Sequence, residues 1–88
     1  MQIEVRQPNE AEIAEAKTWP EWEKEVSEFP WSYDEQETCL ILSGHAVVDG
    51  ASGEHAEFGA GDYVIFPVGL QATWKIDETI RKKYKFGA

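Results

Sequence analysis

The sequence is poor in cysteine, histidine and basic residues, and it contains no long hydrophobic run. Its 88 residues include one cysteine, which excludes an internal disulfide and a zinc site built on cysteines. Eight Lys and Arg stand against 17 Asp and Glu, giving a net charge of -9. An acidic surface of this size disfavours binding to nucleic acid and to anionic membranes. No apolar stretch approaches the roughly 18 residues of a membrane span, and no charged-then-apolar leader opens the chain.

What is present is enough for a packed core. Hydrophobic residues make up 42% of the chain and aromatic residues 12%, which argues against disorder. The length is that of one domain, so we expect a single domain over residues 1–88. Within it, residues 1–20 are expected to form a strand and a short helix, and residues 21–88 a β-barrel. The expected location is the cytoplasm.

Short β-type segments separated by Gly and Pro make up most of the chain. Asn9 followed by Glu12 is typical of a capping box, and Ile13, Ala14 and Ala16 are expected on the apolar side of a short helix. The predicted strands lie at residues 1–8, 22–26, 38–42, 45–48, 56–58, 63–66, 72–76 and 80–86. Strands at such regular intervals indicate an antiparallel all-β sandwich or barrel with a minor helix.

Charge is unevenly distributed along the predicted strands. Four of the eight basic residues lie within residues 81–85, and four glutamates lie within residues 21–28. Opposite charges on neighbouring strands stabilise their pairing, so we expect these two segments to pair or to form a solvated edge. An anion-binding patch and a charge-matched subunit interface are the alternatives.

Two spacings carry a family resemblance. Residues 37–44, ETCLILSG, have the form Glu-x6-Gly, and residues 61–69, GDYVIFPVG, have the form Gly-x5-Pro-x-Gly. In this order they resemble the closing half of the first cupin motif and the opening half of the second. With the tryptophans at 19, 22 and 74, the chain looks most like short single-domain cupins related to ureidoglycine aminohydrolase. The resemblance implies a small cupin fold, a double-stranded β-helix or jelly-roll barrel.

The resemblance also implies where a metal would bind. Cupins usually hold a divalent metal through two His and one Glu of the first motif and one His of the second. Here the Glu position is Glu37, and the second-motif His position is Ala72. The other two positions fall on Trp31 and Tyr33, or with the longer spacing on Pro30 and Ser32. Three of the four ligands are therefore absent, and a catalytic zinc- or iron-type site needs about three protein ligands.

We therefore expect no metal cofactor, and only Glu37 remains from the motif. A metal held by Glu37 together with water and substrate is the alternative. His45 lies eight residues beyond Glu37, on the order of 26 Å along a strand at about 3.3 Å per residue, and His55 follows a turn. Both histidines are interpreted as surface residues.

Strand parity predicts an aromatic pocket at the mouth of the barrel. Side chains two positions apart on a strand point to the same face, so if Glu37 points inward, residue 39 does too. For the same reason residue 72 shares a face with residue 74, and residue 31 with residue 33. The candidate pocket residues are Trp31, Tyr33, Glu37, Cys39, Ala72 and Trp74. Aromatic faces of such a cleft stack on a sugar ring, a heterocycle or a cation, with the carboxylate accepting hydrogen bonds or pairing with positive charge. Core packing is the alternative for both tryptophans, and a buried, unreactive thiol is favoured for the cysteine.

Three functions follow from these observations. The favoured one is metal-free binding of a small molecule. The second, implied by the resemblance, is an enzyme like ureidoglycine aminohydrolase acting on a small nitrogenous or carbohydrate metabolite. The third is a structural or interaction role as a homodimer, because both parities of residues 38–42 are largely apolar and an exposed apolar sheet face usually finds a partner. No catalytic residue is assigned, and a homodimer is expected in any of the three cases.

Overall fold

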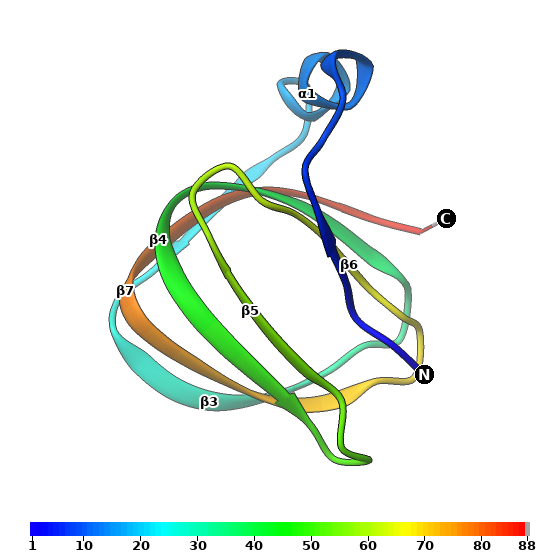
Figure 1. Ribbon diagram of the computed structural model, residues 1–88, viewed down its shortest axis with the longest axis vertical. Coiled ribbons are helices and arrows are strands. Elements are labelled where there is room, and N and C mark those ends of the chain that lie inside the picture. The colour runs from blue at the N-terminus through cyan, green and yellow to red at the C-terminus, as the bar shows by residue number, and fades with distance from the viewer. Residues whose placement is uncertain (88) are drawn as a thin grey trace.

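The chain folds into one strongly curved antiparallel sheet with a short helix outside it (Figure 1). The computed structural model describes residues 1–87. Its elements are β1 (Glu4–Arg6), α1 (Glu10–Ala16), β2 (Glu21–Lys24), β3 (Ser27–Ser32), β4 (Glu37–Gly50), β5 (His55–Gly59), β6 (Tyr63–Phe66) and β7 (Gln71–Phe86). The predicted all-β class with one minor helix is confirmed. Within residues 1–87, no helix combines the length and the apolar character needed to cross a membrane.

Two long strands, β4 and β7, organise the seven-stranded sheet. They pair with each other along most of their length, and each changes its second partner part-way along. On β4 the second partner passes from β6 to β5, and on β7 it passes from β3 to β2. This exchange of partners bends the sheet into the ring of strands seen in Figure 1.

The sequence predicted breaks in both long strands, and these predictions were wrong. Gly44 was expected to bend the chain between the predicted strands at residues 38–42 and 45–48, and residues 77–79 were expected to separate two further strands. Instead β4 and β7 are continuous, and the pairing register shifts between Ser43, His45 and Ala46. Gly44 has a φ of +94° and approaches β7 so closely that an added Cβ would lie 2.1 Å from the carbonyl oxygen of Thr79. A β-bulge with a glycine absorbs the irregularity without ending either strand.

β3 is a strand that the pattern did not predict as a separate element. The alternation from Trp22 to Val26 predicted one strand, but β2 ends at Lys24, and Val26 is exposed before β3 begins. Pro30 lies within β3, which pairs with β7 alone. Proline has no N–H to donate and is tolerated in such an edge strand.

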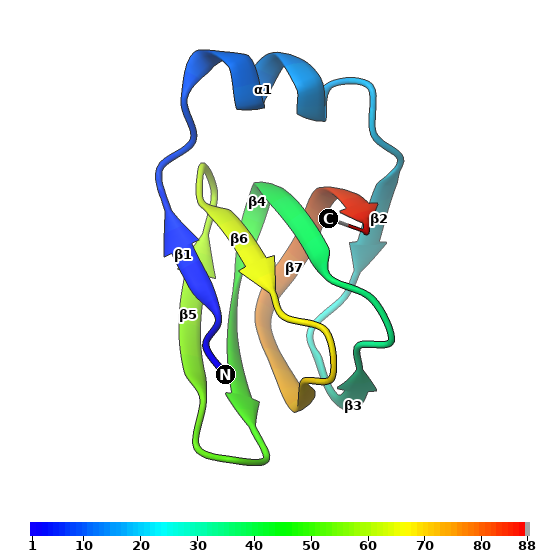
Figure 2. The same ribbon diagram turned by 90° about the vertical axis from the view of Figure 1, so that its right-hand side faces the viewer.

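The N-terminal helix lies outside the curved sheet (Figure 2), and its last residue packs against part of the sheet's outer surface. The predicted capping box is confirmed: Glu12 N–H donates to the Asn9 side chain at 2.8 Å, and Asn9 N–H donates to the Glu12 carboxylate at 3.0 Å. The expected apolar side is confirmed only for Ala16, because Ile13 and Ala14 are exposed. A second cluster outside the main core comprises Ala16, Trp19, Leu40 and Tyr63. Part of the outward apolar surface that motivated the homodimer is thus covered by the chain itself, and the dimer stays a prediction.

The acidic and basic segments pair as expected. Glu21 lies opposite Lys83 and Glu23 opposite Arg81 in the β2–β7 register. Arg81 donates to the Glu21 carboxylate at 2.9 Å, and both side chains reach solvent. The fourth basic residue of this segment, Lys82, behaves differently, because it lies on the opposite face of β7, points into the barrel and is 5% exposed.

The interior is dominated by aromatic rings that meet at Trp74. Its indole ring lies 5.4 Å from the Phe58 ring, 5.5 Å from Phe66 and 6.0 Å from Phe29, measured between centroids. The main core cluster extends from these rings along the inner faces of β4, β6 and β7. Aromatic pairs in offset or edge-to-face contact add to the stabilisation from burial.

Substituting Gly44 with alanine is expected to destabilise the protein more than the same change at Gly53. Both glycines have a φ of +94°, but nothing lies within 4 Å of a Cβ added at Gly53. Gly53→Ala should cost about 1–2 kcal/mol of unfolding free energy from the left-handed backbone alone. Gly44→Ala should cost a further ~1–3 kcal/mol, because the backbone of β7 must move. Urea denaturation of both variants checks this, and equal losses would show that the close approach to Thr79 contributes nothing.

Candidate functional site

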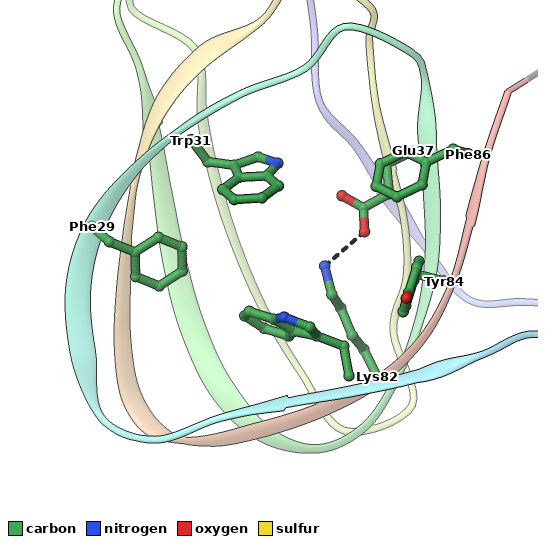
Figure 3. Close-up of a pocket in the computed structure, with 7 residues that line it drawn as sticks. Phe29, Trp31, Glu37, Lys82, Tyr84 and Phe86 are labelled. Carbon is green, nitrogen blue, oxygen red and sulfur yellow. Dashed lines mark hydrogen bonds and ion pairs between the residues drawn. The ribbon is translucent and has the colours of Figure 1, made fainter.

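A cavity of about 160 Å³ opens between β2, β3 and the C-terminal part of β7 (Figure 3). Its walls are mostly aromatic, and its polar side chains include one carboxylate and one ammonium group. The lining residues are Trp22, Phe29, Trp31, Glu37, Lys82, Tyr84 and Phe86. The cavity is therefore an apolar cleft with a few converging polar groups, the usual composition of a small-ligand site.

Strand alternation places these side chains on one face. Lys82, Tyr84 and Phe86 are two residues apart on β7, and Phe29 and Trp31 are two residues apart on β3. Successive side chains of a strand point to opposite faces, so each set faces the same way. In the register of the sheet, Lys82 lies directly opposite Trp22 on one side and Ile41 on the other.

The floor of the cavity is a buried ion pair. Lys82 Nζ lies 2.7 Å from Glu37 Oε2, and the two side chains are 7% and 3% exposed. Lys82 is level with Ile41, four residues along β4 from Glu37, so the length of both side chains is needed to close the gap. Burying either charge alone is costly, whereas the pair attracts strongly in an interior of low dielectric constant.

Aromatic rings surround the ammonium group of Lys82. Its Nζ atom lies 4.7 Å from the centroid of the Trp22 ring, 4.9 Å from Trp74 and 6.0 Å from Tyr84. At these distances the negative faces of the rings attract the cation. The positive charge is therefore stabilised by one carboxylate and by several π systems at once.

Two further polar groups lie beneath the ion pair. The Cys39 thiol donates to Glu37 Oε2 at 3.2 Å, and burial raises the pKa of Cys39 well above its usual value. The thiol is consequently neutral near pH 7 and is no nucleophile. Tyr33 OH accepts a hydrogen bond from Trp74 Nε1 at 3.0 Å. Burial, followed by the nearby Glu37 charge, raises the pKa of Tyr33, so the phenol stays protonated.

The structure divides the six predicted pocket residues between the cavity and the core. Trp31, which is 48% exposed at the mouth, and Glu37 line the cavity. The other four lie in the main core cluster and do not line it: Tyr33, Cys39, Ala72 and Trp74. Glu37 was expected to point inward and to share a strand face with Cys39, and Ala72 was expected to share one with Trp74. The burial of all four side chains agrees with these expectations.

Sequence reasoning missed five of the lining residues, Trp22, Phe29, Lys82, Tyr84 and Phe86. A signal for three of them was present. Residues 80, 82, 84 and 86 alternate with Arg81, Lys83 and Lys85, which puts Lys82 on the same strand face as Ile80 and Tyr84. The pattern was interpreted instead as part of a basic surface segment. Trp22 and Phe29 reach the cavity only because β2 and β3 both pair with β7, a long-range contact that no local spacing reports.

The sequence of residues 11–84 matches the EutQ-like cupin domain family. The chain belongs to this family. Its structure is similar to that of a DUF861 family protein from Thermotoga maritima, with 42% sequence identity and a TM-score of 0.91 over 96% of this chain and 98% of that one. The predicted small cupin fold is thereby confirmed. No curated protein matches the sequence.

More distant EutQ proteins share the fold. An ethanolamine utilization protein Q from Salmonella typhimurium is 24% identical, with a TM-score of 0.69 over 76% of this chain and 54% of that one. The EutQ protein of Clostridium difficile is 16% identical, with a TM-score of 0.69 over 76% of this chain and 52% of that one. The chain thus spans about half the length of either EutQ structure, and at these identities the similarity shows the fold alone.

The residues that the resemblance assigns to the cupin metal positions, with the shorter spacing, do not fit a divalent metal. Trp31 and Ala72 carry no metal-ligating group, and the Tyr33 hydroxyl is protonated and bonded to Trp74. Glu37 is already paired with the Lys82 ammonium group, whose charge repels a second cation placed beside the carboxylate. Within residues 1–87, no group of three or more His, Cys, Asp and Glu side chains is arranged to hold a metal ion.

Both histidines lie outside the cavity. His55 Nδ1 lies 2.6 Å from an oxygen of Asp49 on the exposed β4–β5 hairpin. His45 follows the Gly44 bulge, with Nδ1 2.6 Å from Asp77 and Nε2 2.7 Å from Glu57. The hydrogen bond with Asp77, reinforced by Glu57, raises the pKa of His45 above its usual value. Two carboxylates on opposite nitrogens of the ring favour the protonated imidazole.

Removing one partner of the buried ion pair is expected to destabilise the protein by about 3–5 kcal/mol, because the other charge is left unpaired. Lys82→Met and Glu37→Gln should each show this loss, whereas the double variant should recover most of it. The matched control is the exposed pair Arg81→Met and Glu21→Gln, which should show much less coupling. A double-mutant cycle measured by urea denaturation gives both coupling energies, and similar values for the two pairs would contradict a dominant buried pair.

The contacts of His45 are expected to stabilise the protein at low pH more than at high pH. The pKa of His45 is higher in the folded protein than in the unfolded chain, where it is near 6.5. The stabilisation from these contacts is therefore complete below pH 6.5 and is lost as the pH rises through the folded-state pKa. The difference in unfolding free energy between wild type and His45→Gln should therefore shrink as pH increases through this window. Asp77→Asn should reduce the same pH dependence. Denaturation curves from about pH 5 to pH 9 test both variants, and a constant difference would rule the contribution out.

Proposed function

We propose that this chain is a metal-free binding module that holds a small organic molecule in the cavity above the Glu37–Lys82 pair. The observation that carries the proposal is an aromatic-walled cavity whose floor is a buried, charge-compensated ion pair. Aromatic walls supply contact area for a ring, and the two polar groups orient it.

The size of the cavity supports a ligand of about one ring. Its volume of about 160 Å³ is close to the ~150 Å³ of an engineered apolar cavity that binds benzene. Trp31 and Phe86 are both half-exposed and line the cavity, so a ligand gains contact with side chains that otherwise face water. Removing such apolar surface from water favours binding.

Binding is favoured over catalysis by the state of the polar groups. The carboxylate and the ammonium are held to each other at 2.7 Å, and the thiol beside them is neutral. The relation to ureidoglycine aminohydrolases would require a group that activates water or the substrate. The charged lining side chains are Glu37 and Lys82, and the bond between them holds Glu37 Oε2 on the ammonium group rather than on a substrate. We therefore rank an enzyme of that kind second.

Single-ring compounds that enter the cavity are expected to raise the melting temperature and to change tryptophan fluorescence, because Trp22 and Trp31 form its walls. Trp31→Ala should weaken the binding of such a compound about 2- to 12-fold through the loss of a stacking contact. Val68→Ala, which also shortens an exposed apolar side chain but does not line the cavity, is the control and should bind as wild type. The proposal fails if no single-ring compound changes either signal in the wild-type protein.

A further inference from the structure

The Glu37 carboxylate has one oxygen to spare. Lys82 Nζ and the Cys39 thiol both donate to Oε2. No group of residues 1–87 donates a hydrogen bond to Oε1. Every fully buried side-chain oxygen of these residues has a hydrogen-bond partner, so Oε1 is not fully buried and reaches the surface of the cavity. Figure 3 shows this second oxygen turned toward Trp31. The cavity therefore offers a strong hydrogen-bond acceptor to a ligand.

Lys82 offers the complementary donor. An ammonium group has three N–H bonds, and one of them is used by Glu37. No other oxygen or nitrogen atom of residues 1–87 accepts from Nζ, which otherwise faces the Cys39 side chain, aromatic rings and the cavity. A negative acceptor and a positive donor thus stand next to each other on the cavity floor, and hydrogen bonds to charged groups are the stronger ones.

The charge of the site selects a neutral ligand. The pair has no net charge, so an anionic or cationic group beside it gains one attraction and one repulsion while losing its hydration. Anions are further disfavoured by the net charge of -9. A neutral group satisfies both partners when its own N–H and C=O point the same way, as they do in a primary carboxamide or a lactam.

We infer that the cavity binds a neutral aromatic carboxamide or lactam, whose N–H donates to Glu37 Oε1 and whose carbonyl accepts from Lys82 Nζ. The ring then lies among Phe29, Trp31 and Phe86, and one ring with a carboxamide matches the cavity volume of about 160 Å³. This inference rests on the proposed function, and it adds the chemical class of the ligand.

The test compares four probes of one size and shape on the full chain: benzamide, acetophenone, benzoate and benzamidine. Acetophenone keeps the carbonyl and lacks the N–H, benzoate is an anion, and benzamidine is a cation. Titration calorimetry should show that benzamide binds most tightly, about tenfold or more better than acetophenone, because acetophenone leaves Oε1 buried without a donor. If benzoate, benzamidine or acetophenone binds as well as benzamide, the assigned ligand class is wrong while the proposed binding function stands. If none of the four binds and other single-ring compounds also fail, both are wrong.

The double variant Glu37→Gln with Lys82→Met supplies a second readout. It removes both charges, so acetophenone loses the one bond from Lys82 Nζ to its carbonyl, whereas benzamide loses the charge-assisted bonds to both partners. Its preference for benzamide over acetophenone should fall several-fold, whereas the surface pair Arg81→Met with Glu21→Gln should leave the preference unchanged. A preserved preference in the cavity variant would overturn the assigned hydrogen bonds. If the cavity variant does not fold, the selectivity of the wild-type chain among the four probes decides the inference alone.

Discussion

The pairing of Lys82 with Glu37 is the interaction on which the rest of this structure depends. Each group is almost fully withdrawn from water, and neither charge is tolerable there without the other. Because Glu37 opens β4 and Lys82 lies in β7, the pair links the two longest strands of the sheet where they form the wall of the cavity. A shift of one residue in their register would turn one of the two groups to the opposite face, so the pair also opposes alternative registers.

The ion pair also explains why the cavity and the core form one continuous structure. The rings that surround the ammonium group include Trp74, and Trp74 in turn packs against Phe58 and Phe66 and donates to Tyr33. The strands that bring Trp22 and Phe29 to the cavity are held by β7, which carries Lys82 itself. A ligand on the cavity floor therefore touches residues that stabilise the fold, and its binding is coupled directly to unfolding.

Much of this arrangement was predictable from local pattern, and the remainder depends on contacts between distant segments. Period-two alternation predicted that Glu37 and Cys39 share a face, and the capping residues predicted the start of α1, because both are properties of neighbouring residues. The continuity of β4 and β7 depends on the contact of Gly44 with Thr79, 35 residues away, so local pattern predicted a bend at the glycine but not the unbroken strand around it. Lys82 was hidden for a different reason: its charge suggested the surface, whereas its parity with Ile80 and Tyr84 placed it inside. Of the two signals, parity was decisive, because the chain also supplies a buried carboxylate within reach of the lysine.

The same reasoning clarifies what has happened to the cupin pattern in this chain. The resemblance assigns Glu37 to the first motif, and in this chain a covalently attached ammonium group balances the charge of that glutamate. The resemblance assigns the other ligand positions to Ala72 and to Trp31 and Tyr33, or with the longer spacing to Pro30 and Ser32. An ammonium group carries one charge and directional N–H bonds, so it neutralises the carboxylate completely and still donates to a neighbour. In the binding mode proposed above, a floor of this kind recognises the ligand by hydrogen bonds and shape. Since those bonds need both an acceptor and a donor from the ligand, the proposed mode makes selectivity depend on the pattern of polar atoms on a neutral ring rather than on the charge of the ligand.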